Sequence, residues 1–245
     1  AGALMQELPE LPFEEEGRLM DPVLRENFVE RVFVFHRWQE LVRGRLTAKG
    51  LVEFHTRHKF IVLAHDEKGY RALGRLVAGA GRSGMAELGR DYIRQLMAAL
   101  RKPATRTRHA NVLQHITGFF KRQLSADDKR ELQGLIDSYR RGQVPLVVPI
   151  TMIRHYLRRF PDDYLAGQFY LAPLPICLAG LGWSGMSALI SALTGMVIVG
   201  ASLGPGTDTC PVCGSPPVAG LVQGGDRLRW LSCSLCAGCS MPAWT

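Results

Sequence analysis

Four cysteines near the end of the sequence have the residue type and the spacing of a metal site. Cys210 and Cys213 form one C-x-x-C pair, and Cys233 and Cys236 form a second pair after nineteen intervening residues. Two residues between cysteines let a tight turn direct both thiolates at one ion, and two such turns complete a tetrahedron. This spacing lies in the range of zinc ribbons. We therefore expect one zinc or iron ion here, because a tetrahedral set of four thiolates suits both metals.

The same cysteines also fit other chemistry. Four buried free thiols or two disulfides would have the same composition. Cys239 forms a further C-x-x-C with Cys236, so it is a candidate substitute ligand or a free thiol. Between the two main pairs, Val218–Val222 and Arg227–Leu231 flank a Gly-Gly dipeptide. That pattern predicts a β-hairpin between the two halves of the metal site.

The cationic side chains are concentrated in the first part of the chain, and most of them are arginines. The formal net charge is +8, and residues 1–174 hold 28 of the 30 Lys and Arg and 20 of the 22 Asp and Glu. Guanidinium groups favour bidentate recognition of phosphate or carboxylate. A basic face that is merely solvated is the alternative. The sequence holds no P-loop, dinucleotide fingerprint, nucleophile elbow or H-E-x-x-H motif, so no catalytic residue is assigned.

A second candidate site lies in this basic part. Arg108, Asn111, His115 and Arg122 fall at offsets of 0, 3, 7 and 14 residues, which places them on one side of a predicted helix. The first three of these residues, joined by Arg154 or His155 from a later helix, are predicted to form a ligand site for an anion or a base. The alternative is an ordinary solvated outer face, since surface helices normally have one.

Helical periodicity dominates the sequence before the cysteines. It predicts seven helices, at about 23–46, 51–64, 67–80, 84–101, 105–123, 125–141 and 145–160. Asp21 before Pro22 is the expected N-cap of the first helix, and Ser125 with Asp128 is a variant of the capping box. No alternating strand is predicted before residue 205. The predicted fold is mainly α, with a helical domain of about seven helices and a small C-terminal β zinc ribbon or rubredoxin-like knuckle.

An uncharged stretch separates the helices from the cysteines. Residues 176–203 are apolar or small, long enough for a transmembrane helix, and preceded by arginines. A buried hairpin, an apolar linker and a junction of unrelated sequence fit as well. Its glycines weaken a single helix, and a thiolate site prefers a reducing compartment. No secretory signal opens the sequence. We therefore expect a cytoplasmic protein in which this stretch does not span a membrane.

Two segments of the helical part resemble a known family. Lys102-Pro-Ala-Thr-Arg-Thr-Arg-His-Ala-Asn-Val-Leu-Gln-His-Ile-Thr-Gly-Phe-Phe-Lys121 and Val144–Pro161, continuing through Tyr164–Gln168, resemble the uncharacterised YbgA-like helical domain. That domain is often fused behind an iron–sulfur domain of the thiouracil-desulfurase type. Residues 1–35 resemble the tail of that upstream domain. Its cluster-binding cysteines are not in this sequence, so no iron–sulfur cluster is expected here.

The cysteine segment resembles a different family. Cys210-Pro-Val-Cys-Gly-Ser-Pro-Pro-Val-Ala219 and Leu228-Arg-Trp-Leu-Ser-Cys-Ser-Leu-Cys236 are similar to the metal-binding knuckles of FdhE, the formate dehydrogenase accessory protein. Members of that family have rubredoxin-like cysteine knuckles and help to mature formate dehydrogenase. The further C-x-x-C pairs of the family are absent after Cys236. A genuine fusion and a sequence artefact both fit this composite pattern.

These observations predict four parts. They are a tail of an upstream domain or linker (1–20), a YbgA-like helical domain (21–174), an apolar linker (175–207) and a truncated cysteine ribbon (208–245). The leading predicted function is that of a non-catalytic metal-binding accessory or interaction protein. The alternatives are the helical part of a thiouracil-desulfurase-type enzyme of nucleobase or RNA sulfur metabolism, and a nucleic-acid-binding module. The expected partner is a thiouracil-desulfurase-type domain or another protein; nucleic acid is an alternative, and a membrane is not expected.

Overall fold

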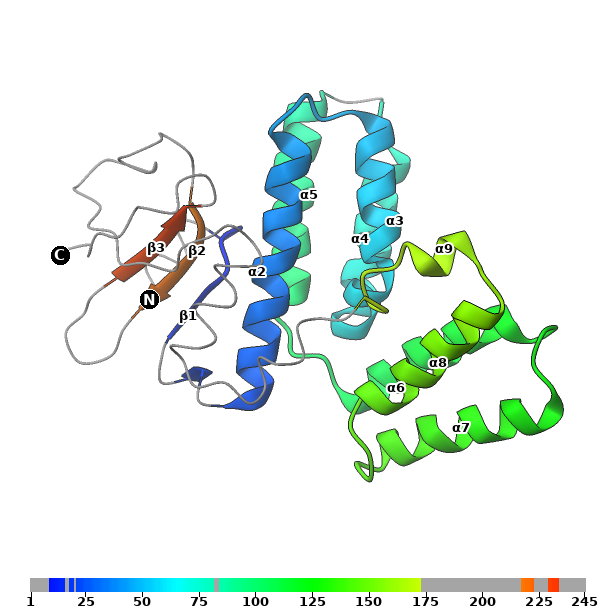
Figure 1. The fold of residues 1–245 in the computed structure, drawn as a ribbon. Helices are drawn as coiled ribbons and strands as arrows, with labels where there is room; N and C mark the ends of the chain where they lie inside the picture. The colour runs from blue at the N-terminus through cyan, green and yellow to red at the C-terminus, as the bar shows by residue number, and fades with distance from the viewer. Residues whose placement is uncertain are drawn as a thin grey trace. The chain divides into compact units, whose positions relative to one another are not determined.

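The described part of the chain is mainly helical (Figure 1). The computed structural model describes residues 9–15, 18–19, 21–81 and 84–172, together with the backbone of 217–222 and 229–233. The chain divides into two compact units. Unit 1 comprises residues 1–47, 83–101 and 174–245, and unit 2 comprises residues 48–82 and 102–173. The predicted four-part division stays a prediction, because compactness alone does not test its boundaries.

Two long helices form the helical part of unit 1. Helix α2 (Pro22–Val42) begins as predicted, because the Asp21 carboxylate accepts hydrogen bonds from the backbone N–H groups of Val23 and Leu24. Helix α5 (Met85–Leu100) packs beside it. Trp38 stacks on Tyr92 with ring centroids 5.4 Å apart. Asn27 donates a buried hydrogen bond of 2.8 Å to the carbonyl oxygen at the end of α5.

A short strand, β1 (Phe13–Glu15), precedes these helices and corrects the prediction that no strand occurs before residue 205. Three residues are too few to show an alternating pattern, and a charged residue such as Glu14 does not suggest a buried strand. Glu14 is only 4% exposed, and it forms ion pairs with Arg18 at 2.8 Å and with Arg31 at 3.9 Å. Arg31 also donates to the Phe13 carbonyl oxygen at 2.8 Å. Burial lowers the pKa of Arg31 to about 10, although the Glu14 carboxylate opposes that shift.

Strand β1 belongs to a three-stranded sheet in unit 1. The strand order is β1, β2 (Pro217–Val222) and β3 (Arg229–Cys233). Strand β1 pairs with β2 in parallel, with Phe13 opposite Gly220. Strands β2 and β3 are antiparallel, with Leu221 opposite Trp230. Strand β2 covers the first predicted hairpin strand, Val218–Val222, whereas β3 is shifted by two residues from the predicted Arg227–Leu231.

Unit 2 contains most of the remaining helices. They are α3 (Ala48–His65), α4 (Glu67–Ala78), α6 (Arg106–Thr117), the 3-10 helix η2 (Gly118–Phe120), α7 (Ala126–Arg140), α8 (Val147–Arg159) and α9 (Asp163–Ala166). Helix α3 packs against α4 and α6, and α6, α7 and α8 pack against one another (Figure 1). Buried aliphatic side chains from several of these helices form the core, among them Leu51, Leu73, Leu113, Ile116, Ile136 and Ile153. Each such residue stabilises the fold by about 1.5–3 kcal/mol.

The seven predicted helices are confirmed, with ends that differ by a few residues. Ser125 and Asp128 form the predicted capping box at the start of α7. Gly142, two residues after the last residue of α7, has a positive φ of 79°. Helix α9 is an addition, since four residues carry no readable period; the Asp162 side chain caps it by accepting from the Leu165 N–H.

Two predictions concern residues that the structure does not describe. The apolar stretch 176–203 lies outside the described residues. So do Cys210, Cys213, Cys236 and Cys239 of the cysteine segment, whereas Cys233 is described only as backbone. Among the helices that the structure does describe, none combines the length and the hydrophobicity needed to cross a membrane.

Candidate functional site

Helix α6 presents the predicted polar residues to solvent. Its side chains at 110, 112, 113 and 116 are buried, whereas Arg108, Asn111 and His115 are exposed. The Thr105 hydroxyl begins the helix by accepting from the Arg108 N–H at 3.3 Å. The stripe of polar residues is therefore the outer face of an amphipathic helix whose inner face belongs to the core of unit 2.

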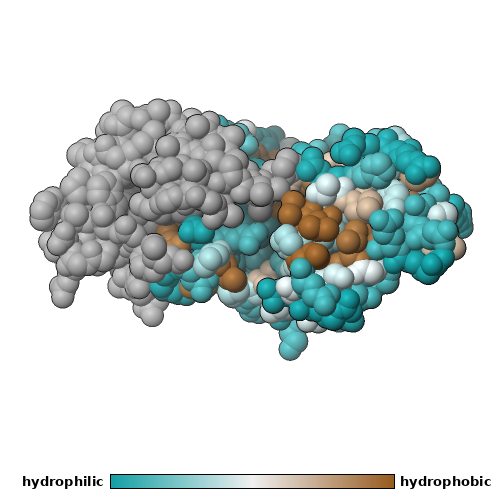
Figure 2. All heavy atoms as spheres, turned by 60° about the horizontal axis from the view of Figure 1, so that its bottom comes forward, coloured by the Kyte–Doolittle hydropathy of each residue, from teal (hydrophilic) through white to brown (hydrophobic). Residues whose placement is uncertain are grey.

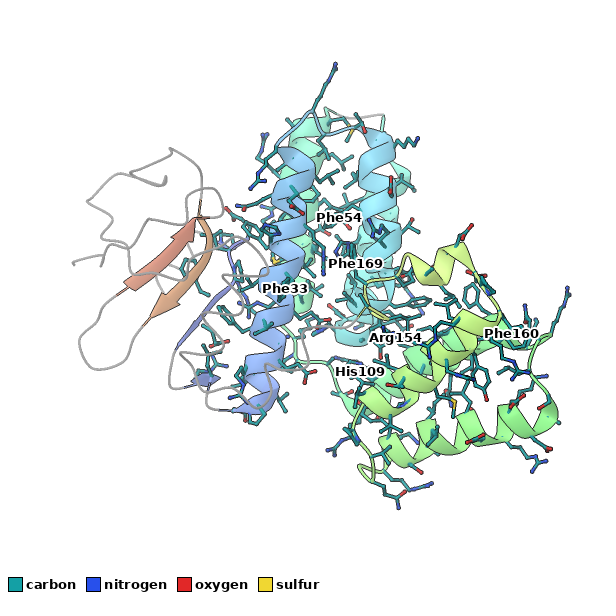
Figure 3. All side chains as sticks on the ribbon, in the orientation of Figure 1. Phe33, Phe54, His109, Arg154, Phe160 and Phe169 are labelled. Carbon is teal, nitrogen blue, oxygen red and sulfur yellow. The ribbon has the colours of Figure 1, made fainter. Side chains whose placement is uncertain are left out.

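The later pair of predicted residues lies on α8. Arg154 is half-buried and His155 is exposed; Figure 3 labels Arg154 on this helix. No hydrogen bond or ion pair between described residues joins this pair to Arg108, Asn111 or His115. The predicted five-residue ligand site therefore stays a prediction, and the contacts in unit 2 centre on other residues.

One cluster of polar contacts lies where α3 ends and α4 begins. The Nδ1 atom of His65 lies 2.6 Å from the Lys102 carbonyl oxygen, and Lys102 forms an ion pair with Asp66. Asp66 also caps α4, accepting from the Lys68 N–H at 3.2 Å. Burial raises the pKa of Asp66, but hydrogen bonds from Lys102, Gly69 and Lys68 outweigh burial and hold the pKa below its ordinary value. These contacts fix the segment that leads into α6.

A second cluster anchors the end of unit 2 to α3. Gln168 is 2% exposed, and its Nε2 donates to the carbonyl oxygens of Thr56 at 3.0 Å and Tyr164 at 3.3 Å. The Arg57 guanidinium lies 4.2 Å from the centre of the Phe169 ring, and its Nε donates to the Gly167 carbonyl oxygen at 3.2 Å. Figure 3 shows Phe169 beside α3. The family-like segment Tyr164–Gln168 thus serves the packing of unit 2.

A third contact joins α6 to the same segment. The Nδ1 atom of His109 lies 2.9 Å from the Tyr170 hydroxyl oxygen, and their rings are tilted at a centroid distance of 5.8 Å. Figure 3 shows His109 near the start of α6. Sequence reasoning did not single out His109 or Tyr170, because two residues 61 positions apart share no local pattern. The available signal was the family-like match Lys102–Lys121, which contains His109, and a second match that ends two residues before Tyr170.

His55 and His58 of α3 pack against aromatic side chains. His58 is fully buried between aromatic rings, with its ring centroid 4.0 Å from that of Phe54 and 4.6 Å from that of Phe169. His55 stacks on Tyr70, and burial, followed by the Lys59 charge, lowers the pKa of His55. Within the described ranges, no three His, Cys, Asp or Glu side chains converge to hold a metal ion.

The charge excess of the chain belongs to unit 2. Its residues include 19 Lys and Arg and 9 Asp and Glu, a difference of +10. Residues 92–126 and 138–161 contain no carboxylate, so α6 and α8 have none, whereas α7 carries four. Hydrophilic side chains cover much of the described surface in Figure 2, around a smaller hydrophobic area. The arrangement of unit 2 therefore separates a mixed-charge helix from two purely cationic ones.

The cysteine segment matches known proteins over a short range. Residues 209–238 match the central domain of FdhE. The chain is 40% identical over 79 residues to the Protein FdhE homolog of Pseudomonas aeruginosa, an alignment that covers 30% of this chain and 24% of that protein. Protein FdhE of Salmonella dublin is 37% identical over 79 residues, covering 31% of this chain and 24% of that protein. This chain thus spans about a quarter of either FdhE relative. No solved structure matches the chain.

The helical part matches over a long range. Residues 59–175 match the family described as "Protein of unknown function (DUF1722)". The Uncharacterized protein YbgA of Escherichia coli is 36% identical over 146 residues. That alignment covers 59% of this chain and 86% of YbgA. The chain belongs to the family of YbgA, with a short FdhE-like segment near its C-terminus.

Proposed function

We propose that this chain is a metal-binding accessory or interaction protein rather than a catalyst. In this proposal Cys210, Cys213, Cys233 and Cys236 hold one zinc or iron ion, and Cys239 is not one of the four ligands. Four thiolates saturate the coordination of a tetrahedral ion, so a closed site of this kind stabilises a small fold rather than activating water. The ion would hold together a segment of about 30 residues, which is too short to build a sizeable core alone.

The register of the hairpin is the observation that carries this proposal. Strands β2 and β3 pair so that Pro217, at the start of β2, is opposite Cys233 in β3. Cys213 precedes Pro217 by four residues, so the covalent chain limits their separation to about 14 Å. The second C-x-x-C pair therefore begins at the same end of the hairpin to which the first pair is tethered. Such a register fits four ligands to one ion.

The accessory role is supported by the two similarities taken together. The FdhE-like match spans the four cysteines. The resemblance to FdhE implies an accessory role in maturation rather than catalysis. YbgA, which matches the helical part, is named only as an uncharacterised protein. We propose that the partner is a protein, with a thiouracil-desulfurase-type domain as the first candidate. The parallel pairing of β1 with β2 supports one polypeptide in which N-terminal and cysteine segments work together.

The metal proposal is tested by elemental analysis of the full chain purified under reducing conditions. We expect about one zinc or iron per chain, and Cys213→Ser should abolish that stoichiometry because three thiolates bind far more weakly. Cys177→Ser is the matched control, since that cysteine lies outside both C-x-x-C pairs. A wild-type chain without bound metal, or equal metal in wild type and Cys213→Ser, contradicts the proposal.

A further inference from the structure

The outer face of α6 continues into η2 and carries more than the predicted polar residues. Arg108, Asn111, His115, Phe119 and Arg122 follow one another at intervals of three or four residues, and all five are exposed. The backbone on both sides of η2 keeps right-handed helical dihedrals, with φ of −61° at Thr117 and −59° at Lys121. Residues at these intervals share one side of a helix. They form a stripe about 21 Å long at a rise of 1.5 Å per residue.

Phe119 is the unusual member of this stripe. It is 41% exposed, although a phenylalanine on the surface of a helix forfeits burial of its ring. Its ring stacks on that of Tyr164 at a centroid distance of 5.4 Å. The Lys59 ammonium lies 5.7 Å from the centre of the same Tyr164 ring. Phe119 and Tyr164 therefore form a partly exposed aromatic pair beside a cationic side chain.

The cations of this face have no carboxylate partners among the described residues. Protein surfaces normally mix both signs, and α7 does so, with Arg130 paired to Asp127 and Arg140 paired to Asp137. By contrast, no described ion pair involves Arg106, Arg108 or Arg122. Unpaired arginines on a carboxylate-free helix are complementary to a polyanion rather than to a mixed-charge protein surface.

We propose that the stripe formed by Arg108, Asn111, His115, Phe119 and Arg122 binds single-stranded nucleic acid. In this proposal the arginines contact phosphates. Arg108 has N–H groups left for this contact, because a guanidinium carries five and only one of them donates to the His65 carbonyl oxygen. Phe119 stacks on an unpaired base, which a duplex does not offer. Asn111 and His115 lie between them and offer donors and acceptors for base edges or sugars. This inference is independent of the cysteine site.

Binding is measured by fluorescence anisotropy, with the full chain and labelled RNA and DNA strands of about 20 nucleotides. We expect both single strands, or one of them, to bind more tightly than a duplex of the same sequence. The affinity should fall as salt rises from about 50 mM to 200 mM, as counterion release requires. Tighter binding of the duplex, or equal competition by polyglutamate at matched charge, would overturn the proposal.

Matched variants locate the surface. Arg122→Gln should weaken binding several-fold and make the salt dependence shallower by about one phosphate contact. Arg130→Gln removes the same charge from the mixed-charge helix α7 and should leave binding unchanged. An equal loss in both variants would mean that net charge alone drives binding, and the proposal would be wrong.

The aromatic step needs its own pair of variants. Phe119→Leu should weaken single-strand binding about 5-fold or more, whereas Phe119→Tyr keeps the ring and the affinity. Quenching of 2-aminopurine in the strand should disappear in Phe119→Leu alone. Unchanged affinity and quenching in that variant would contradict the proposed stacking of a base on Phe119. Cys213→Ser should bind the strand as wild type does, which separates this test from that of the metal site.

Discussion

Nη1 of Arg108 donates a hydrogen bond of 2.6 Å to the backbone carbonyl oxygen of His65, the last residue of α3. The last carbonyls of a helix have no partner within the helix, so Arg108 caps α3 from a helix that begins 41 residues later. The same arginine belongs to the exposed stripe of α6. One side chain thus ties the start of α6 to the end of α3.

The contact between His109 and Tyr170 should contribute measurably to the stability of unit 2. Tyr170→Phe removes the hydroxyl and should lower the free energy of unfolding by about 1 kcal/mol, because a partly buried hydrogen bond is lost. His109→Phe should cost a similar amount, and the double variant should cost clearly less than the sum of both. Urea denaturation of the four proteins gives these values. Strictly additive losses would contradict a direct interaction between the two side chains.

Two glycines near α7 should respond in opposite directions to alanine. Gly142 has a φ of +79°, and a Cβ there would lie 3.0 Å from Arg106 Nη1. Gly142→Ala should therefore destabilise the chain by about 1–2 kcal/mol. Gly134 is an exposed residue inside α7 with no atom near its would-be Cβ, so Gly134→Ala should stabilise by up to about 1 kcal/mol. Thermal unfolding of both variants checks the contrast, and a neutral Gly142→Ala would refute the strained turn.

His55 should make the stability of unit 2 sensitive to mild acid. Burial, and then the Lys59 charge, lowers the pKa of His55 below its ordinary value of 6.5. As the pH falls below 6.5, the unfolded chain binds a proton first, so stability is full above that pH and is lost as the pH falls toward the folded-state pKa. In His55→Gln this part of the loss should vanish. The free energy of unfolding at pH 7.5 and at pH 5.5 tests this; parallel curves for both proteins would contradict it.

Local patterns in the sequence predicted the helices of this chain well. Asp21 and Ser125 were recognised as the N-caps of α2 and α7, because a cap is made by residues two or three positions apart. The polar stripe on α6 was predicted because its residues recur at helical intervals of three and four positions. Phe119 was missed, since an aromatic residue beside Phe120 is normally taken for core; its position four residues after His115 was the available signal.

Contacts between distant segments were beyond such patterns. The buried pair of Glu14 and Arg31 joins a three-residue strand to α2, and a charged residue in a strand suggests exposure rather than burial. Gln168 contacts Thr56 across 112 positions, and no periodicity records such a distance. The sequence therefore predicted elements and exposed faces, while the anchoring of unit 2 required the fold itself.

X-ray absorption at the metal edge of the purified full chain tests the central claim most directly. The proposal predicts one zinc or iron surrounded by four sulfur atoms at about 2.3 Å, the usual zinc–thiolate distance. Cys233→Ser should replace one sulfur neighbour by a lighter atom or release the ion. A metal shell of nitrogen and oxygen alone, or a chain that binds no metal when its cysteines are reduced, would contradict the assignment of this protein as a metal-binding accessory protein.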